Sequence, residues 1–322
     1  LFHAFYIWYT IYHLPEGETP AEIEDVLDFI EANRPVRPIP RDVQDIPDVS
    51  IVIPVHGVER YVAECLGSIQ RQSLQNFEVI LIDDVSSDRS AEIVEGFATH
   101  DPRFRLVRRT ENVGPGFARN QGIDLARGRF VLFIDPDDYM PDPGHLQRVL
   151  AMADADKADM VRYRKRHEQI EDEQGTVLKM RRDATEAFFP HEVHRTSLAK
   201  HHAIAHSRHF WNWLYRRDFL DRNQIRFLTT YREERAFLLQ AYMANPVISL
   251  CDSDGVVYRI RSNSAVRRAQ TMADVDDQLQ NFDLVVRHLR DHGALDPGSP
   301  HWWLTRFQVS QFLHYLYFGF AW

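Results

Sequence analysis

The stretch that decides the fold is VSIVIPVHGVERYVAECLGSIQRQSLQNFEVILIDD, Val49–Asp84. Its first seven residues and the run at 77–84 are almost continuously apolar and rich in Val and Ile, which is typical of strands buried on both faces of a parallel sheet. The residues between them, 59–73, place apolar side chains at helical spacing. A strand, a helix and a second strand in this order predict a right-handed βαβ unit.

The same alternation continues along the chain. We expect a helix at 87–100, a strand at 103–109, a helix at 116–128 and a fourth strand that ends at Asp135. Strands and helices that alternate over this length predict an α/β fold with a doubly wound, mainly parallel sheet.

The pattern loosens after Pro141. We expect one long hairpin that joins residues 159–170 to residues 176–182, and a second hairpin around Asp252–Gly255, where turn-forming residues interrupt an apolar run. A strongly periodic stretch at 273–293 predicts a helix that ends at a glycine.

These patterns divide the chain into three parts. Residues 1–47 form an N-terminal extension, with a helix expected at Thr19–Pro35 followed by a proline-rich linker. Residues 48–260 form the main domain, with a nucleotide-binding half at 48–142 and an acceptor-side half at 143–260. Residues 261–322 form a helical, aromatic-rich C-terminal extension.

Composition limits the class of protein. A chain of 322 residues with 44% hydrophobic and 26% charged residues is typical of a globular protein with a substantial core. Its net charge of −9 argues against a protein that wraps nucleic acid. The two cysteines, Cys65 and Cys251, form neither a metal-ligand pattern nor a disulfide framework, which suits a reducing compartment.

Aromatic residues are concentrated at both termini. The opening Leu1–Leu14 lacks the basic start and cleavage site of a signal peptide and is shorter than the roughly 20 residues of a membrane span. The final stretch, His301–Trp322, is open to three interpretations: packing against the main domain, joining a larger parent polypeptide, or peripheral contact with a membrane. The expected location is cytoplasmic, either free or at the inner face of the membrane.

Polar residues follow three of the predicted strands, as PVHG at 54–57, DDVSSD at 83–88 and DPDD at 135–138. The carboxyl ends of parallel strands meet at one edge of a sheet, where ligands bind in this fold class. Asp135 and Asp137, two residues apart in a turn, can point to the same side and hold a hard divalent cation together with a diphosphate. The alternative is a solvated loop in which Asp138 caps a helix.

Two common nucleotide-binding motifs are absent from the sequence. No G-x-G-x-x-G follows the first strand, and no G-x-x-x-x-G-K-[ST] occurs. The sequence therefore argues against a dinucleotide-dependent oxidoreductase and against a P-loop enzyme.

Three stretches together resemble a known family. They are VSIVIPVHGVERYVAECLGSIQRQSLQNFEVILIDDVSSDRS, ENVGPGFARNQGIDLARGRFVLFIDPDDYM and the later FWNWLYRRDFL, IRF and YREERAF. In order and spacing they are similar to glycosyltransferase family 2, whose fold is GT-A. The resemblance covers about Asp48 to Ile260 and leaves out both termini.

The resemblance implies roles for particular residues. The first strand end would contact the nucleotide through Pro54 and Val55, with the nearby Glu59. Asp83 and especially Asp84 would contact the base and ribose. Arg119 and Asn120 would line the nucleotide–sugar pocket. Asp135 and Asp137 would bind Mn²⁺ or Mg²⁺ with the diphosphate, with the adjacent Asp138 as a third candidate metal ligand.

In the family, an E-D-x-x-F stretch supplies the base that deprotonates the acceptor hydroxyl. The matching EERAF makes Glu234 the candidate base and Glu233 its neighbour. Successive helical residues diverge by about 100°, so the two carboxylates cannot face one pocket equally. We expect one to act as the base and the other to form a salt bridge, for example with Arg232 or Arg235.

The function implied is a metal-dependent, inverting glycosyltransferase of the hexosyl or N-acetylhexosaminyl type, which moves a sugar from a UDP-sugar to a glycan or lipid-linked glycan in bacterial surface polysaccharide synthesis. A sugar-1-phosphate nucleotidyltransferase would need a glycine-rich loop after the first strand, where PVHGVERY has one glycine. A second alternative is a non-catalytic GT-A-like module that binds a glycan or a partner enzyme.

The sequence also departs from the family. Val85 stands where the family usually has Gly, and His56 and Gly57 stand where Tyr and Asn are common. Glu234 replaces an Asp and lengthens the candidate base by one methylene.

Overall fold

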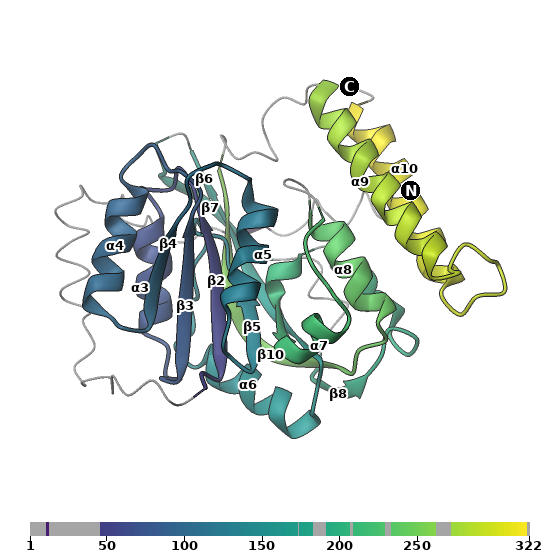
Figure 1. The fold of residues 1–322 in the computed structure, drawn as a ribbon, viewed down its shortest axis with the longest axis horizontal. Helices are drawn as coiled ribbons and strands as arrows, with labels where there is room; N and C mark the ends of the chain where they lie inside the picture. The colour runs from purple at the N-terminus through teal and green to yellow at the C-terminus, as the bar shows by residue number, and fades with distance from the viewer. Residues whose placement is uncertain are drawn as a thin grey trace.

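The computed structural model describes residues 11–12, 46–172, 174–182, 191–206, 209–228, 233–261 and 272–320. Four strands pair in parallel in the order β5-β2-β3-β4: β2 (Val49–Val55), β3 (Phe77–Asp83), β4 (Phe104–Arg108) and β5 (Phe130–Phe133). The helices α3 (Val62–Gln70), α4 (Ser90–His100) and α5 (Pro115–Leu125) connect them (Figure 1). The four predicted strands and the helices between them are confirmed.

The direction of the chain across the sheet reverses beside β2. From β2 the chain proceeds outward to β3 and β4, and then returns through α5 to β5 on the other side of β2. Because such crossovers are right-handed, α3 and α4 lie on one face of the sheet and α5 lies on the other. Ligands in doubly wound sheets bind at this reversal point, beyond the carboxyl ends of the strands.

The second half of the chain extends the same sheet with mixed strand directions. β9 (Trp213–Arg216) pairs antiparallel with β5 and with β6 (Met160–Glu171), and β6 pairs antiparallel with β7 (Val177–Arg182). β1 (Ile11–Tyr12) pairs with β7, and β8 (Val193–Thr196) pairs with β10 (Ile248–Ile260). The remaining elements of this half are α6 (His145–Asp156), the 3₁₀ turns η3 (His202–His206) and η4 (Phe210–Asn212), α7 (Arg217–Arg222) and α8 (Glu234–Met243).

One of the two predicted hairpins is confirmed and the other is wrong. β6 and β7 form the first, whereas residues 248–260 form one continuous strand, β10 (Ile248–Ile260), parallel to β6. Register shifts between Leu250 and Val257 absorb the turn-like residues. Gly255 permits a close approach, because an added Cβ would lie 2.0 Å from the Tyr163 ring.

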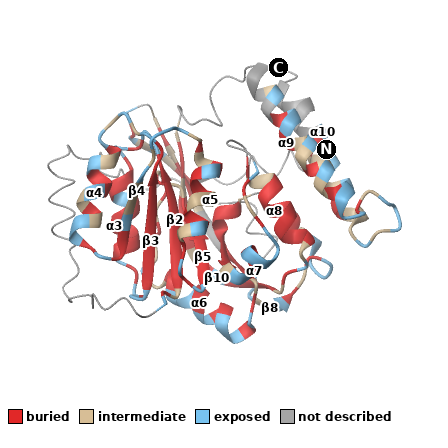
Figure 2. Cartoon of the chain, in the orientation of Figure 1, coloured by how far each residue is buried: buried red, intermediate tan, exposed pale blue. Residues whose placement is uncertain are grey.

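The core follows the apolar runs in the sequence. Every residue of β2, β3 and β5 is buried, whereas the edge strand β4 is only partly buried (Figure 2). At the end of β5, the Phe133 ring makes edge contacts with four other aromatic rings, at centroid distances of 5.4–5.8 Å: Phe210, Tyr215, Phe227 and Phe237. This aromatic cluster packs at the end of β5, directly before the carboxylates that follow this strand in the chain.

The C-terminal region forms two helices, α9 (Met272–Asp291) and α10 (Trp302–Phe320), which run beside each other away from the sheet (Figure 1). The Phe282 and Phe312 rings stack at 3.8 Å between them, and His202 of η3 stacks on Trp303 at 4.2 Å. The structure shows the expected helices. Of the three interpretations of His301–Trp322, the contact between His202 and Trp303 supports packing against the main domain. No described helix is both long and apolar enough to cross a membrane. Apart from β1, the N-terminal extension, including the helix expected at Thr19–Pro35, lies outside the described residues.

Candidate active site

Two half-buried carboxylates follow β5 at the reversal point of the sheet. The Asp138 N–H donates to the Asp135 carbonyl at 3.0 Å, so residues 135–138 form a tight turn. The side chains of Asp135 and Asp137 are 24% and 19% exposed. Burial raises the pKa of Asp135, and the negative charge of Asp137 raises it further, against the opposing effect of Arg119. The two carboxylates are thus close enough to repel each other.

Asp138 lies behind this pair. It is 1% exposed, and its Oδ1 accepts the N–H of Arg259 at 2.8 Å. Burial, together with the charges of Asp137 and Asp135, raises the pKa of Asp138 well above its ordinary value. Asp138 therefore connects the turn to the end of β10. Of the three aspartates, Asp135 and Asp137 are the ones that are partly exposed at the site.

Arg119 joins the Asp135 side of the site to the start of α8. Its guanidinium, 5% exposed, lies 2.6 Å from Asp135 Oδ1 and also forms an ion pair with Glu233 Oε1. The Phe210 ring lies 4.5 Å from its Cζ atom and packs against the guanidinium plane. One buried cation therefore fixes two acidic groups that are 98 residues apart in sequence, at 135 and 233.

Glu233 and Glu234 have different environments. Glu233 is 5% exposed, and burial raises its pKa to about 7, with Arg119 opposing that change and Glu234 adding to it. Glu234 begins α8 and is partly exposed. Its negative charge contributes, after larger causes, to the raised pKa of Asp135. We expected one of the two glutamates to form a salt bridge, and Glu233 forms one with Arg119. Arg232, one of the partners considered, lies outside the described residues.

The side chains of Asn120 and Glu59 form hydrogen bonds with backbone groups of other segments. The Asn120 side chain donates to the Phe227 carbonyl at 2.7 Å and accepts the Phe227 N–H at 2.9 Å. This pairing holds the segment that leads toward α8. The Glu59 carboxylate accepts the Arg89 N–H at 2.9 Å, at the beginning of α4. Neither position was predicted to have these partners, because local sequence does not show which distant backbone group a polar side chain will meet.

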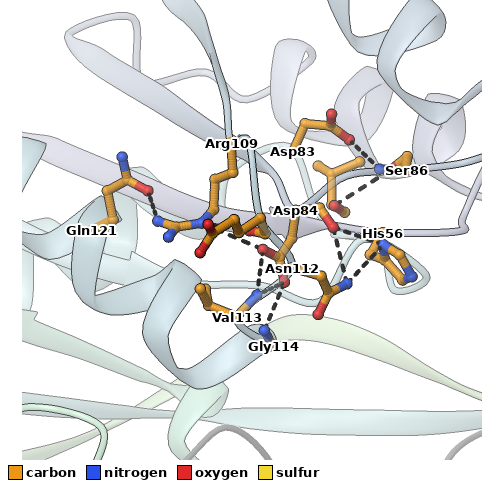
Figure 3. A network of polar contacts seen from close by, with 11 residues as sticks. His56, Asp83, Asp84, Ser86, Arg109, Asn112, Val113, Gly114 and Gln121 are labelled. Carbon is orange, nitrogen blue, oxygen red and sulfur yellow. Dashed lines mark hydrogen bonds and ion pairs between the residues drawn. The ribbon is translucent and has the colours of Figure 1, made fainter.

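The ends of β2, β3 and β4 form a second polar group, shown in Figure 3. The Asp84 carboxylate accepts the N–H of Val113 at 3.0 Å and of Gly114 at 2.7 Å, and Arg109 lies 3.4 Å away. Asp83 Oδ1 accepts the Ser86 N–H at 3.2 Å. Pro54 and Val55 are buried at the end of β2, where the Val55 carbonyl accepts the Asp84 N–H at 2.9 Å. Asp84 thus orders the loop that leads into α5.

His56 and Asn112 complete this second group. His56 Nδ1 lies 2.9 Å from the Asp84 carbonyl, and Asn112 Nδ2 donates to the same oxygen at 3.0 Å (Figure 3). A carbonyl oxygen only accepts, so Nδ1 of His56 is the donor in this contact. Sequence analysis noted His56 only as a departure from the family and did not find Asn112 or Arg109.

Arg261 is the functional candidate that sequence analysis missed most clearly. It lies one residue beyond β10 and forms an ion pair with Asp137 Oδ2. A signal was present, because Arg259 and Arg261 are two residues apart and share one face of a strand. The centre of the Tyr61 ring lies 5.1 Å from the Arg259 Cζ and 4.8 Å from the Arg261 Cζ.

The donor set at the end of β5 fits a hard divalent cation. Among the described residues, no three His, Cys, Asp or Glu side chains form a complete protein-only site. Two adjacent carboxylates instead match the way Mg²⁺ is commonly bound, by one or two carboxylates with substrate phosphates and water. Asp135 and Asp137 are the residues that would hold it.

Comparison with known proteins shows the family. The profile of Glycosyl transferase family 2 matches residues 50–223. The chain belongs to glycosyltransferase family 2. It is 33% identical over 241 residues to the uncharacterized glycosyltransferase EpsJ of Bacillus subtilis, covering 73% of this chain and 67% of EpsJ. It is 29% identical to the succinoglycan biosynthesis protein ExoO of Rhizobium meliloti, covering 71% of this chain and 65% of that protein.

Solved structures show the same fold. S. aureus TarS 1–349 in complex with UDP-GlcNAc has a TM-score of 0.65 at 22% identity, covering 84% of this chain and 72% of TarS 1–349. The mannosyltransferase PcManGT of Pyrobaculum calidifontis, in complex with GDP-Man and Mn²⁺, has a TM-score of 0.52 at 18% identity, covering 92% and 78% of the two chains. The predicted α/β, GT-A-type fold class is confirmed. The chain matches about two thirds of the length of EpsJ and of its B. subtilis relative EpsH, 67% and 64%.

Proposed function

We propose that this chain is a metal-dependent, inverting glycosyltransferase that transfers a hexosyl or N-acetylhexosaminyl group from a UDP-sugar to a hydroxyl of a glycan or lipid-linked glycan. The observation that carries the proposal is the Asp135–Arg119–Glu233 bridge, which holds the paired carboxylates next to the candidate base. The family match, the polysaccharide-related names of relatives and the UDP-GlcNAc complex of TarS support it.

Asp135 and Asp137 would hold Mn²⁺ or Mg²⁺ together with the donor diphosphate. A divalent cation bound there neutralises negative charge on the departing nucleoside diphosphate. Arg119 keeps Asp135 oriented, because its ion pair with Glu233 and its stacking on Phe210 fix the guanidinium. Burial also strengthens these electrostatic contacts relative to contacts in water.

Glu234 is the proposed general base. Its side chain is partly exposed, whereas Glu233 is 5% exposed and already paired with Arg119. Glu234 would accept the proton of the acceptor hydroxyl as the oxygen attacks the anomeric carbon and the bond to the diphosphate breaks. This direct displacement inverts the anomeric centre and needs one base and no covalent nucleophile.

Nucleoside recognition would take place at the ends of β2 and β3. Asp84 would act by ordering the loop at 112–114, since its carboxylate binds the backbone there. Asp83, Pro54 and Val55 would form the adjoining wall. We further propose a cytoplasmic location for the reaction, with any contact to a membrane made by the aromatic terminal regions.

The test is release of UDP from UDP-glucose and UDP-GlcNAc, with water as acceptor. Glu234→Gln should lower kcat by about 10²–10⁴-fold with little change in donor KM, because it removes the base and keeps the shape. Glu233→Gln is the matched comparison and should lower kcat less. Equal turnover by Glu234→Gln and the wild type would rule out Glu234 as the base. Absence of release from any nucleotide sugar would favour the non-catalytic binding module.

A further inference from the structure

Each of the paired carboxylates is held by an arginine, but the two arginines are held differently. Arg119 is fixed by a second ion pair, with Glu233, and its side chain is 5% exposed. The Arg261 side chain is 24% exposed, and among the described residues its ion pair is with Asp137 alone. Its Nε, like that of Arg119, is buried without a hydrogen-bond acceptor among the described residues. Arg261 therefore has donor capacity to spare.

The backbone next to Arg261 is anchored while its side chain extends into the site. Arg259 forms ion pairs with Glu171 at 3.0 Å and with Glu64, and its N–H donates to Asp138. These contacts fix the end of β10. From that fixed point, Arg261 crosses the Tyr61 ring, with Cζ 4.8 Å from the ring centre, to reach Asp137.

This contact competes with a metal for the same carboxylate. A guanidinium stays protonated and cannot act as a metal ligand. A divalent cation on Asp137 and a guanidinium on the same carboxylate repel each other, so binding of one weakens binding of the other. A diphosphate provides an alternative partner, because its oxygens accept paired hydrogen bonds from a guanidinium.

We propose that Arg261 is an internal counter-cation, which occupies Asp137 in the nucleotide-free protein and moves to the donor diphosphate when nucleotide and metal bind. This inference rests on the proposed function. It makes metal and nucleotide binding mutually reinforcing: the nucleotide removes Arg261 from Asp137, and the metal frees Arg261 for the nucleotide. By linkage, each ligand then tightens the other by the same factor.

The experiment measures Mn²⁺ binding from the electron paramagnetic resonance signal of free Mn²⁺, first without nucleotide and then with saturating UDP. Arg261→Gln should bind Mn²⁺ about 3–10-fold more tightly than the wild type without UDP, since the competing cation is gone. The factor by which UDP tightens Mn²⁺ binding should be smaller in Arg261→Gln than in the wild type. Arg108→Gln is the matched control, because Arg108 pairs with Glu95 on the surface with both side chains more than half exposed, at 55% and 61%.

Arg261→Lys provides a second variant that retains the positive charge, and it should bind Mn²⁺ without UDP nearly as the wild type does. Equal Mn²⁺ affinity without UDP for the wild type, Arg261→Gln and Arg261→Lys would overturn the counter-cation role while leaving the metal site intact. If the wild type, Arg261→Gln and Arg261→Lys all fail to bind Mn²⁺ even with UDP, the metal site of the proposed function fails as well.

Discussion

At the scale of one residue, Val85 places a β-branched side chain on a backbone conformation that favours glycine. Its φ of +62° lies in the left-handed region, which β-branched residues rarely adopt. The side chain is 41% exposed, so packing does not compensate. Contacts of its neighbours, such as Asp83 with the Ser86 N–H at 3.2 Å, hold the turn. Val85 therefore holds, with strain, a backbone conformation that a glycine would adopt freely.

Val85→Gly should raise the free energy of unfolding by about 1 kcal/mol. Relief of about 1–3 kcal/mol of strain exceeds the roughly 0.5–1 kcal/mol lost to the greater freedom of glycine in the unfolded chain. Urea denaturation measures the change. Val85→Ala is the control and should show little gain, because it keeps a Cβ in the same conformation. A Val85→Gly protein less stable than the wild type would contradict the strain.

His145 illustrates the contacts between elements. It is the first residue of α6, is fully buried, and places Nδ1 2.8 Å from Ser253 Oγ in β10. Its ring also meets the Tyr163 ring of β6 edge-on at 4.4 Å. Burial lowers the pKa of His145 to about 3, from an ordinary value of 6.5. One neutral imidazole therefore helps to hold α6 on the two strands that lead to the site.

The free energy of unfolding should fall on acidification. Between pH 6.5 and pH 3 the unfolded chain protonates His145 and the folded chain does not. The stabilisation is thus complete above about pH 6.5 and is lost progressively as pH falls toward 3. His145→Asn keeps a hydrogen-bonding group near Ser253 without the titration. Its stability should decrease less between pH 7 and pH 4, measured by urea unfolding at each pH; parallel curves for the two proteins would contradict this.

At the element scale, sequence was sufficient where burial is uniform. Apolar runs predicted β2, β3 and β5, because every residue of these three strands is buried. The edge strand β4 is only partly buried, and its place in the alternation of strands and helices predicted it. The mistaken hairpin at Asp252–Gly255 came from turn-forming residues, whose role depends on the neighbouring strand β6 and the Tyr163 ring. Likewise, the partners of Asn120 and Arg261 depend on which distant segments the fold brings together.

At the scale of the whole molecule, one sheet joins a parallel half, which ends in the polar group around Asp84, to a mixed half, which contributes Glu233, Glu234 and Arg261 (Figure 1). Arg119 of the parallel half forms an ion pair with Glu233 of the mixed half. Arg261 of the mixed half forms an ion pair with Asp137, which follows β5. Proteins with this fold bind different donors: TarS was solved in complex with UDP-GlcNAc and PcManGT in complex with GDP-Man. Side chains at the junction, rather than the fold, must therefore decide donor and metal use.

The central claim is that a nucleotide binds at this junction through a metal on Asp135 and Asp137. A thermal-shift panel of UDP, GDP, CMP and TDP, each with and without Mn²⁺, tests it most directly, since a ligand of the native state raises Tm. We expect UDP with Mn²⁺ to raise Tm by about 5 °C or more at a hundredfold excess over Kd. Asp137→Asn should abolish the shift, and Asp218→Asn, an exposed control on α7, should retain it. No Mn²⁺-dependent shift with any nucleotide, or an unchanged shift in Asp137→Asn, would contradict the account.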